Sequence, residues 1–447
     1  MTTQALPTQQ RRRGRVLENW NPEDPDFWAR EGSKVANRNL LASIFSEHLG
    51  FSIWTLWSVL VLFMTPENGF TIDVAAKFLL TSVIALVGAV MRVPYTLAVP
   101  RFGGRNWTVS NTFILLVPTA AAAYLITQPG SPYWAFLLAG IVAGFGGANF
   151  SSSMTNINQF FPERRKGWAL GLNAGGGNIG VAAIQVVGLV VIAVFGTAHP
   201  EYLPYFYLPL VLLAALVAIR YMDNIAGTKA DARKQFAVMK DKHSWVMSFL
   251  YIGTFGSFIG YSFAFGLVLQ NQFNRTPVEA MAVTFLGPLL GSLSRPVGGW
   301  LSDKIGGAKV TCWNFGAMIA GVGVILLASA QDSLGVFTTG FIVLFVLTGV
   351  GNGSTYKMIP SIFAAQAQDR IAAGSDPEDA RKWARLNSGS LIGLCGAIGA
   401  VGGVLINLAF RQSFLSVGSG SPAFVAFLIF YAVCMVTTFA VYLRRPA

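Results

Sequence analysis

Two arginine residues lie deep inside long apolar segments of this sequence. Arg92 and Arg295 each stand nine residues before a basic residue, Arg101 or Lys304, at which a polar loop begins. In a helix that rises about 1.5 Å per residue, each would lie about 13 Å inside the apolar layer. A charge at that depth is costly and is retained mainly where it faces a cavity or a partner. The two arginines therefore predict a buried polar site.

The surroundings of the two arginines favour an anionic ligand. Neither has an acidic residue at a similar depth in its own segment, and Glu47 is the only carboxylate deep in any apolar segment. Two guanidinium groups with at most one counter-charge need an anion in a low-dielectric site, and their planar forks of N–H donors suit a flat oxyanion. We therefore expect a small planar anion as the ligand.

Sequence motifs of enzymes and metal centres are missing. The chain contains no P-loop and no HExxH motif, and His48, His199 and His243 are too widely spaced to predict a metal or haem centre. No pair of carboxylates resembles a catalytic site. We expect no enzymatic activity, no cofactor and no metal ion.

The composition is that of an all-α integral membrane protein. Of 447 residues, 53% are hydrophobic and 12% are charged, whereas a soluble domain is roughly 25% charged. Cys312, Cys395 and Cys434 lie in apolar segments and are interpreted as free core residues. Apolar stretches of about 20 residues are long enough to cross a bilayer. Twelve begin near Leu40, Ile72, Asn106, Pro132, Gly167, Leu203, Ser244, Val278, Ala308, Val336, Arg385 and Pro422.

The basic residues orient the chain in the membrane. Lys and Arg gather in the N-terminal tail, in alternate loops and at the C-terminus, whereas the intervening loops contain only Arg275 and Arg411. By the positive-inside rule, this distribution places both termini in the cytoplasm. The net charge of +12 is thereby explained without a nucleic-acid partner.

The two halves of the chain are similar. "RVPYTLAVPRFGGRNWTVSN" from Arg92 and "RPVGGWLSDKIGGAKVTCWN" from Arg295 share a Gly pair, a Thr and a final Asn in register. Two repeats of six spans are related by an axis along the membrane normal, which brings both arginines to one central cavity. We predict a tail (1–39), a first lobe (40–222), a linker (223–243), a second lobe (244–443) and a C-terminal tail (444–447). A polar segment between spans ten and eleven is expected to be partly helical at the membrane surface.

Four other ionisable residues fall inside spans. Lys77 is expected to extend toward water from the outer end of its span. Glu47 and His48 lie at about the depth of the arginines and could exchange a proton there, or pair with polar groups of neighbouring helices. Lys357, in "GNGSTYKMIP", is expected to lie deep and could pair with Glu47.

The segment Gly144 to Val181, "GFGGANFSSSMTNINQFFPERRKGWALGLNAGGGNIGV", resembles the signature of the nitrate/nitrite porter (NarK-like) family of the major facilitator superfamily. "GNGSTYKMIP", "LYIGTFGSFIGY" and "NWNPEDPDFW" are similar to other parts of that family, and "GGWLSDKIGG" resembles a loop of the superfamily. The resemblance implies twelve transmembrane helices in two pseudo-symmetric six-helix lobes, usually working as a monomer.

The resemblance also implies roles for individual residues. Nitrate or nitrite would be clasped by Arg92 and Arg295, while Phe145 and Phe255 cover its faces. Tyr251 would donate a hydrogen bond, and Asn173 and Asn149 would be polar neighbours. Ordinary packing remains open for each Phe, and Asn173 and its repeat mate Asn387 could instead bond between helices. Glycines that let the helices approach and move are predicted at Gly144, Gly146, Gly147, Gly171, Gly175, Gly176, Gly177 and Gly180.

Two coupling modes are compatible with the sequence. Two fixed positive charges repel each other without an anion, which favours nitrate/nitrite antiport. Family members proposed as proton symporters tend to carry charges in spans one and ten, where this chain has Glu47, His48 and Lys357. We favour nitrate/proton symport, with antiport as the alternative and another small-anion carrier or an anion channel as more distant ones.

Overall fold

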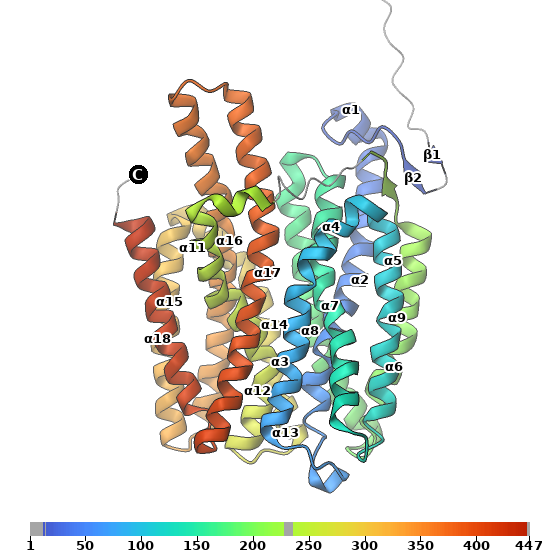
Figure 1. Cartoon of the computed structure of the whole chain (residues 1–447), viewed down its shortest axis with the longest axis vertical. Coiled ribbons are helices and arrows are strands. Elements are labelled where there is room, and N and C mark those ends of the chain that lie inside the picture. The colour runs from blue at the N-terminus through green and yellow to red at the C-terminus, as the bar shows by residue number, and fades with distance from the viewer. Residues whose placement is uncertain (1–11, 14, 228–235, 445–447) are drawn as a thin grey trace, which may run out of the picture.

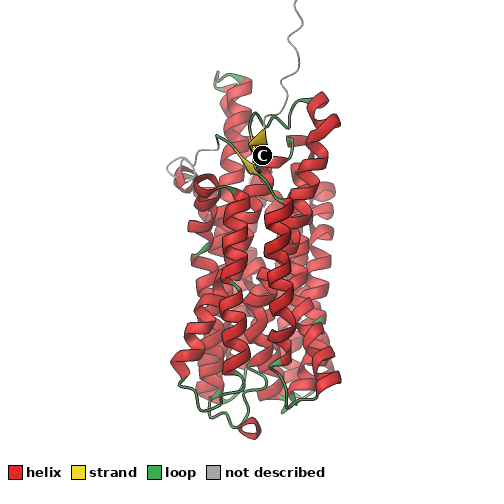
Figure 2. Ribbon diagram, turned by 90° about the vertical axis from the view of Figure 1, so that its right-hand side faces the viewer, coloured by secondary structure: helices red, strands yellow, loops and turns green. Residues whose placement is uncertain are grey.

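The computed structural model describes residues 12–13, 15–227 and 236–444, which form a bundle of long, nearly parallel helices (Figures 1 and 2). Parts of the predicted N-terminal tail, linker and C-terminal tail lie outside the described residues. A short sheet at the end of the bundle pairs β1 (Arg12–Arg13), β2 (Val16–Leu17) and β3 (Asn224–Ile225). We call this end of the bundle the terminal side, and the opposite end the distal side.

The first lobe contains six helical columns. After α1 (Pro25–Phe27) and the π-helical turn η1 (Trp28–Gly32) come α2 (Ser33–Leu60), the short η2 (Pro66–Asn68), α3 (Val74–Val90) with α4 (Arg92–Phe102), α5 (Gly104–Ile114) with α6 (Leu116–Leu125), α7 (Tyr133–Phe160), α8 (Glu163–Phe195) and α9 (Tyr202–Tyr221).

The second lobe repeats this arrangement. It contains η3 (Val238–Lys240), then α11 (Lys242–Tyr251), the π-helical turn η4 (Ile252–Gly256) and α12 (Ser257–Gln272) as one column, followed by α13 (Pro277–Thr284) with α14 (Leu286–Ile305), α15 (Gly307–Ala330), α16 (Leu334–Ala372), α17 (Pro377–Val417) and α18 (Ser421–Thr438), which ends in η5 (Phe439–Leu443).

Eleven of these columns are long and apolar enough to cross a membrane. The twelfth is α2, which carries Glu47 and His48 and has most of its residues buried by the rest of the lobe. A helix enclosed by its neighbours presents little surface to lipid, so it can contain polar residues that an outer helix would exclude. The predicted fold of twelve helices is confirmed. Cys312, Cys395 and Cys434 are free and buried, as expected.

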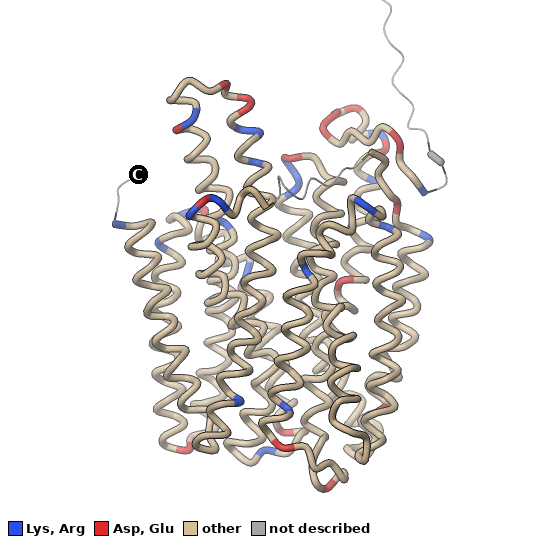
Figure 3. Tube along the Cα trace, viewed as in Figure 1, with Lys and Arg blue, Asp and Glu red and all other residues tan. Residues whose placement is uncertain are grey.

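Lys and Arg residues concentrate along the backbone at the terminal side, which agrees with the predicted asymmetry of basic loops (Figure 3). The segment between spans ten and eleven differs from the prediction. Instead of lying at a surface, α16 and α17 continue as a helical hairpin that projects beyond the bundle (Figure 1). The guanidinium of Arg370 lies 3.6 Å from the Trp383 ring centre, and Trp383 packs on Phe363, so the hairpin has a small core of its own.

The two lobes contact each other closely in the distal half. Phe78 of α3 stacks on Phe410 and Phe414 of α17, with ring centres 5.8 and 5.5 Å apart. The Gln270 side-chain amide donates a 2.8 Å hydrogen bond to the Leu62 carbonyl across the lobe boundary. These contacts join the lobes on the side away from the basic loops.

Candidate functional site

Arg92 is the first residue of α4 and its side chain is completely buried. The break before it is explained by Pro94, which has no N–H to offer the Val90 carbonyl. Its Nη1 donates a 2.9 Å hydrogen bond to the Gly396 carbonyl of α17, in the other lobe. Its Nε and Nη2 have no hydrogen-bond partner within the described part of the chain. One complete edge of the guanidinium therefore remains available to an acceptor.

Aromatic rings from both lobes surround Arg92. Its guanidinium carbon lies 4.8 Å from the ring centre of Phe150 in α7 and 5.0 Å from that of Phe255 in η4. Trp54 of α2 contributes a third ring at 5.8 Å. Such contacts between a cation and ring faces are favourable, particularly away from water. The rings hold the guanidinium in place without using its free hydrogen-bond donors.

Arg295 of α14 lies in a different environment. It is half-buried, its Nη2 donates to the Tyr251 hydroxyl at 3.4 Å, and its guanidinium carbon lies 5.0 Å from the centre of the Tyr356 ring. Its Nη1 is buried and has no partner among the described residues. Tyr251 stacks on Phe255, with ring centres 5.2 Å apart. A continuous path of contacts therefore leads from Arg92 through two rings to Arg295.

The π-helical turn η4 positions these two rings. Tyr251 directly precedes it and Phe255 lies within it, four residues later, so their side chains stack along one face. Gly399 of α17 lies against this turn, where an added Cβ would come within 2.5 Å of the Tyr251 ring. Only glycine leaves room for that close approach. Turns of this kind in α-helices occur frequently at functional sites.

Glu47 of α2 lies in a second polar cluster close to the arginines. One carboxylate oxygen, Oε2, accepts hydrogen bonds from the Ser153 hydroxyl and, at 2.6 Å, from the Asn173 amide. The other, Oε1, is buried and has no partner in the described part of the chain. The charges of Glu47, Arg92 and Arg295 are close enough to interact electrostatically. Asn173 therefore contacts the carboxyl group, and its effect on an anion between the arginines would be indirect.

Other predicted site residues occupy distinct places. The half-buried His48 ring lies with its Nδ1 3.1 Å from the Gly176 carbonyl oxygen. Asn149 donates a 3.2 Å hydrogen bond to the Ser46 carbonyl and so ties α7 to α2. Phe145 packs beside Tyr95, with ring centres 6.4 Å apart. Asn387, proposed as the mate of Asn173, donates to the Trp383 carbonyl one turn before it in its own helix.

Two predictions about lysines are wrong. Lys357 neither lies deep nor pairs with Glu47: about half of its side chain is exposed, and its Nζ lies 2.8 Å from Asp303 Oδ1 of α14. Tyr356 faces the site, and the next residue of a helix points about 100° away from it. Lys77 does not extend to water, because its side chain is only 6% exposed. Lys77 lies one turn after Asp73, and the opposite charges of the two side chains attract each other.

Three residues of the site are missing from the sequence prediction. Phe150 lies in the same signature as Phe145, but five residues along a helix place the two rings on different faces. Tyr356 is adjacent to Lys357, which was singled out for its charge. Gly396 contributes only a backbone carbonyl. The glycine-rich segment indicates close packing in general and does not identify which carbonyl accepts a hydrogen bond.

The glycines of α7 and α8 differ in their surroundings. A Cβ on Gly146 would lie 2.2 Å from the Gly50 carbonyl oxygen, and one on Gly177 would lie 2.3 Å from Glu47 Oε1. The latter glycine thus makes room for the buried carboxyl group. Similar close neighbours, at 2.2 to 2.6 Å, exist for Gly144, Gly147, Gly176 and Gly180, whereas Gly171 and Gly175 face open space.

The family model of the Major Facilitator Superfamily matches residues 41–375. The chain belongs to this superfamily. Within it, the chain is 38% identical to the "Nitrate/nitrite transporter NarU" of Salmonella typhimurium, over 96% of both chains. It is 32% identical to the "Probable nitrate/nitrite antiporter NarK2" of Thermus thermophilus, over 97% of this chain and 98% of that one. The chain is therefore a member of the nitrate/nitrite porter family, as the sequence predicts.

Solved structures of the superfamily have the same fold. The nucleoside transporter NupG has a TM-score of 0.61 at 12% identity, covering 90% of this chain and 99% of that one. A bacterial homologue of the lysosomal transporter Spinster, in an inward-facing and occupied conformation, has a TM-score of 0.62 at 14% identity, covering 91% and 98%. The chain is a multi-pass membrane carrier rather than an enzyme.

Proposed function

We propose that this protein transports nitrate, and also nitrite, across a bacterial cytoplasmic membrane, with both termini in the cytoplasm. The observation that carries the proposal is the set of buried guanidinium donors without partners in the described chain, Nε and Nη2 of Arg92 and Nη1 of Arg295. Buried N–H groups of native proteins nearly always find an acceptor. An anion that enters between the lobes would supply one to both arginines.

Nitrate matches this arrangement in shape and charge. Two of its oxygens can accept hydrogen bonds from the Nε–Nη2 edge of Arg92, as a carboxylate does in a bidentate pair. Its flat face suits the rings of Phe255 and Tyr251, and the Tyr251 hydroxyl can donate to an oxygen. Nitrite has the same charge and two oxygens at a similar spacing. The names of the two relatives, a nitrate/nitrite transporter and a probable antiporter, support the same ligands.

We propose alternating access of one central site to the two sides of the membrane. The distal contacts join the lobes on that side in this conformation, and we propose that the anion reaches the site from the terminal side. One contact is a buried hydrogen bond of 3.0 Å from the Thr81 hydroxyl of α3 to Asn407 Oδ1 of α17. With the rings of Phe78, Phe410 and Phe414, this pair forms what we call the distal gate. Opening it requires the lobes to rock apart there.

Proton-coupled uptake is the mode that we favour. Glu47 is completely buried near the arginines, and its Oε1 lies without a partner among the described residues. A carboxyl group in that position can hold a proton on the free oxygen, and its charge changes the electrostatic balance around the anion when the proton leaves. With Lys357 paired to Asp303, Glu47 and His48 are the remaining candidates for coupling.

Nitrate/nitrite antiport is the second candidate mode. Its support is the same pair of partly unpaired arginines, because two positive charges in a low-dielectric site repel each other and oppose closure of an empty carrier. The anion site of an exchanger would return to the first side of the membrane only when the second anion binds. The Thermus thermophilus relative is named a probable nitrate/nitrite antiporter, which favours this mode for that protein.

Labelled nitrate uptake into proteoliposomes tests the proposal. One preparation receives an inward pH gradient and no internal anion, and the other receives internal nitrite without a pH gradient. Symport predicts accumulation in the first, and antiport predicts it only in the second. Absence of uptake under both conditions, by protein that is folded and reconstituted, would overturn nitrate transport.

Glu47→Gln then separates coupling from binding. We expect the variant to lose accumulation driven by the pH gradient while it keeps counterflow between nitrate and nitrite, because the amide cannot carry the proton but preserves shape. Glu67→Gln, at an exposed position of the distal side, serves as the matched control. Unchanged accumulation in Glu47→Gln would exclude Glu47 as the coupling group.

A further inference from the structure

A groove between α2 and α9 lies on the outer face of the first lobe, away from the arginine site. It has a volume of about 570 Å³ and is lined by Lys34, Asn37, Arg38, Leu41, Ala42, Val217 and Tyr221. The five α2 residues recur with the i, i+3, i+4, i+7, i+8 spacing of one helix face, and the two α9 residues are one turn apart. The groove therefore runs along both helices at their terminal ends.

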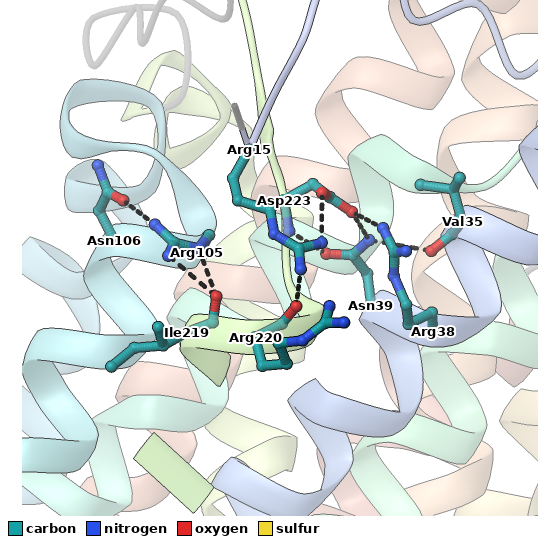
Figure 4. A network of polar contacts seen from close by, with 9 residues as sticks. All are labelled: Arg15, Val35, Arg38, Asn39, Arg105, Asn106, Ile219, Arg220 and Asp223. Carbon is teal, nitrogen blue, oxygen red and sulfur yellow. Dashed lines mark hydrogen bonds and ion pairs between the residues drawn. The ribbon is translucent and has the colours of Figure 1, made fainter. Parts of the chain in front are cut away.

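The terminal end of this groove is strongly basic. In the network drawn in Figure 4, Arg15 and Arg38 contact the carboxylate of Asp223, and Arg105 and Arg220 lie at the nearby end of α9. Asp223 is buried and pairs with Arg38 and, at 3.5 Å, with Arg15. Two of the four guanidinium groups, those of Arg15 and Arg38, pair with this one carboxylate, so the cluster has an excess of positive charge.

Several contacts fix this cluster without neutralising it. Arg15 donates to the Arg220 carbonyl, and Arg105 donates to the Ile219 carbonyl at 2.9 Å. Both acceptors are uncharged backbone groups at the end of α9. The Nε of Arg38 is buried and has no partner within the described residues, although its Nη2 bonds Asp223. Lys34 lines the same end of the groove and has no ion pair in the described part of the chain.

The other end of the groove is apolar and faces outward. Leu41 is 66% exposed, one turn deeper along α2 than Arg38. Ala42 packs with Val217 and Ala218 to form the floor. Tyr221 is exposed at the boundary between the basic and apolar ends, a position that tyrosine favours at membrane interfaces. Positive charge thus meets apolar surface at the terminal ends of α2 and α9.

We propose that this groove binds an anionic phospholipid, with its phosphate at Lys34 and Arg38 and an acyl chain along Leu41, Ala42 and Val217. Basic pockets between helices on the cytoplasmic side suit such headgroups. A free phosphate ion would pair with the basic residues but would leave the apolar residues of the groove without a ligand. The amphiphilic lining therefore favours a lipid as the occupant. This site is separate from the anion site, and its test does not depend on transport.

Native mass spectrometry of the purified full chain in detergent tests the site. The probes are phosphatidylglycerol and phosphatidylcholine with identical acyl chains, and separately inorganic phosphate. Wild-type protein should retain phosphatidylglycerol in preference to phosphatidylcholine. Lys34→Gln should lower that retention about fivefold, since each basic residue near a membrane surface contributes about 1 kcal/mol. Val217→Trp, which fills the apolar strip, should lower it as well.

Lys309→Gln is the matched control, because Lys309 is an exposed lysine on the terminal side of the second lobe, outside the groove. Equal loss of phosphatidylglycerol in Lys309→Gln and Lys34→Gln would overturn the site in favour of general surface charge. Equal retention of both lipids by the wild type would also overturn it. Displacement of the lipid by inorganic phosphate at similar concentration would assign the groove to a free anion instead.

Discussion

The two arginine environments differ although the repeat places the arginines at equivalent positions. Arg92 is completely buried, contacts three rings and bonds the opposite lobe through Gly396. Arg295 is half-buried and contacts tyrosines of its own lobe. Arg92 therefore reports on the relative position of the lobes, whereas Arg295 is free to follow an anion. Similarity of sequence between repeats fixes the depth of a charge, while its neighbours determine its role.

The same inequality extends to the acidic partners. Glu47 lies close to the arginines in the first lobe. The two repeats are offset by 203 residues, as Arg92 and Arg295 are, so Leu250 is the equivalent of Glu47 and Tyr251 is the equivalent of His48. The second lobe instead pairs Asp303 with Lys357 near the terminal side, where both side chains are about half exposed. A partly exposed ion pair contributes little to stability or coupling because water screens it. The coupling to protons that we propose is therefore placed in the first lobe.

The largest effect is expected from lysine substitution of the arginines. Arg92→Lys should lower nitrate affinity at least about 100-fold, because it removes the two-donor edge and a charge-assisted hydrogen bond is worth up to about 3 kcal/mol. Arg295→Lys should lower affinity about 10-fold, since fewer of its donors are buried and unpaired. Nitrate binding measured by calorimetry or by proteoliposome uptake distinguishes the two. Arg101→Lys, exposed in the same helix as Arg92, should change affinity by less than about twofold. Equal losses in the two site variants would refute the functional difference between the lobes.

The two phenylalanines of the signature provide a second comparison. Phe150→Ala should lower nitrate affinity about 10-fold, because the Phe150 ring orients the Arg92 guanidinium and a buried cation–ring contact is worth about 1 to 2 kcal/mol. Phe145→Ala should have an effect of about twofold or less, because its ring packs beside Tyr95. Affinities from the same binding assay, corrected for the thermal stability of each variant, check this. A larger loss in Phe145→Ala would restore the role that the family resemblance implied for that ring.

A smaller effect is expected at the tyrosine hydroxyls near Arg295. Tyr251→Phe should lower nitrate affinity about fivefold, because it removes a hydroxyl that accepts from Arg295 and can donate to the anion. Tyr356→Phe should have a smaller effect, since the hydroxyl that Arg295 bonds belongs to Tyr251 and the Tyr356 ring that packs on the Arg295 guanidinium is kept. Competition of labelled nitrate by unlabelled nitrite measures both variants. If Tyr356→Phe binds as weakly as Tyr251→Phe, the distinction between the two hydroxyls is wrong.

A further effect, similar in size to that of Tyr251→Phe, concerns the distal gate rather than the anion. Thr81→Val removes the hydrogen bond between the lobes at nearly constant shape and should raise the population open on the distal side about fivefold, for a bond worth about 1 kcal/mol. Distances between spin labels at the exposed positions Glu67 and Val417 report this population. Ser82→Ala is the control, because the Ser82 hydroxyl donates to the Phe78 carbonyl of its own helix rather than across the lobes. Equal distance distributions in both variants would show that the bond does not hold the gate.

Much of the fold could be predicted from the sequence. Apolar stretches of sufficient length, the asymmetry of basic loops and the internal repeat are local or statistical properties, and each leads to the twelve-helix arrangement. The hairpin of α16 and α17 was harder to predict, because the choice between lying on the membrane and projecting from it depends on the packing of Arg370, Phe363 and Trp383.

The candidate site also has features that the sequence predicts and features that depend on tertiary packing. The depth of Arg92 and Arg295 follows from residue counts along a helix, and their excess positive charge follows from composition. Which ring covers Arg92 depends on the rotation of α7 relative to α4, which no count along one helix supplies. Lys357 shows where counting along a helix fails. Its position within a span predicted a deep side chain, but the side chain extends from the helix toward Asp303.

The sequence by itself determined that this is a twelve-helix membrane carrier with two arginines deep within its helices, because hydrophobicity and charge act residue by residue. Only the tertiary structure decided how the two arginines differ. Contacts across the lobe boundary, such as Arg92 with the Gly396 carbonyl, join residues 304 positions apart. Such contacts depend on the rotation and spacing of whole helices, which packing fixes collectively.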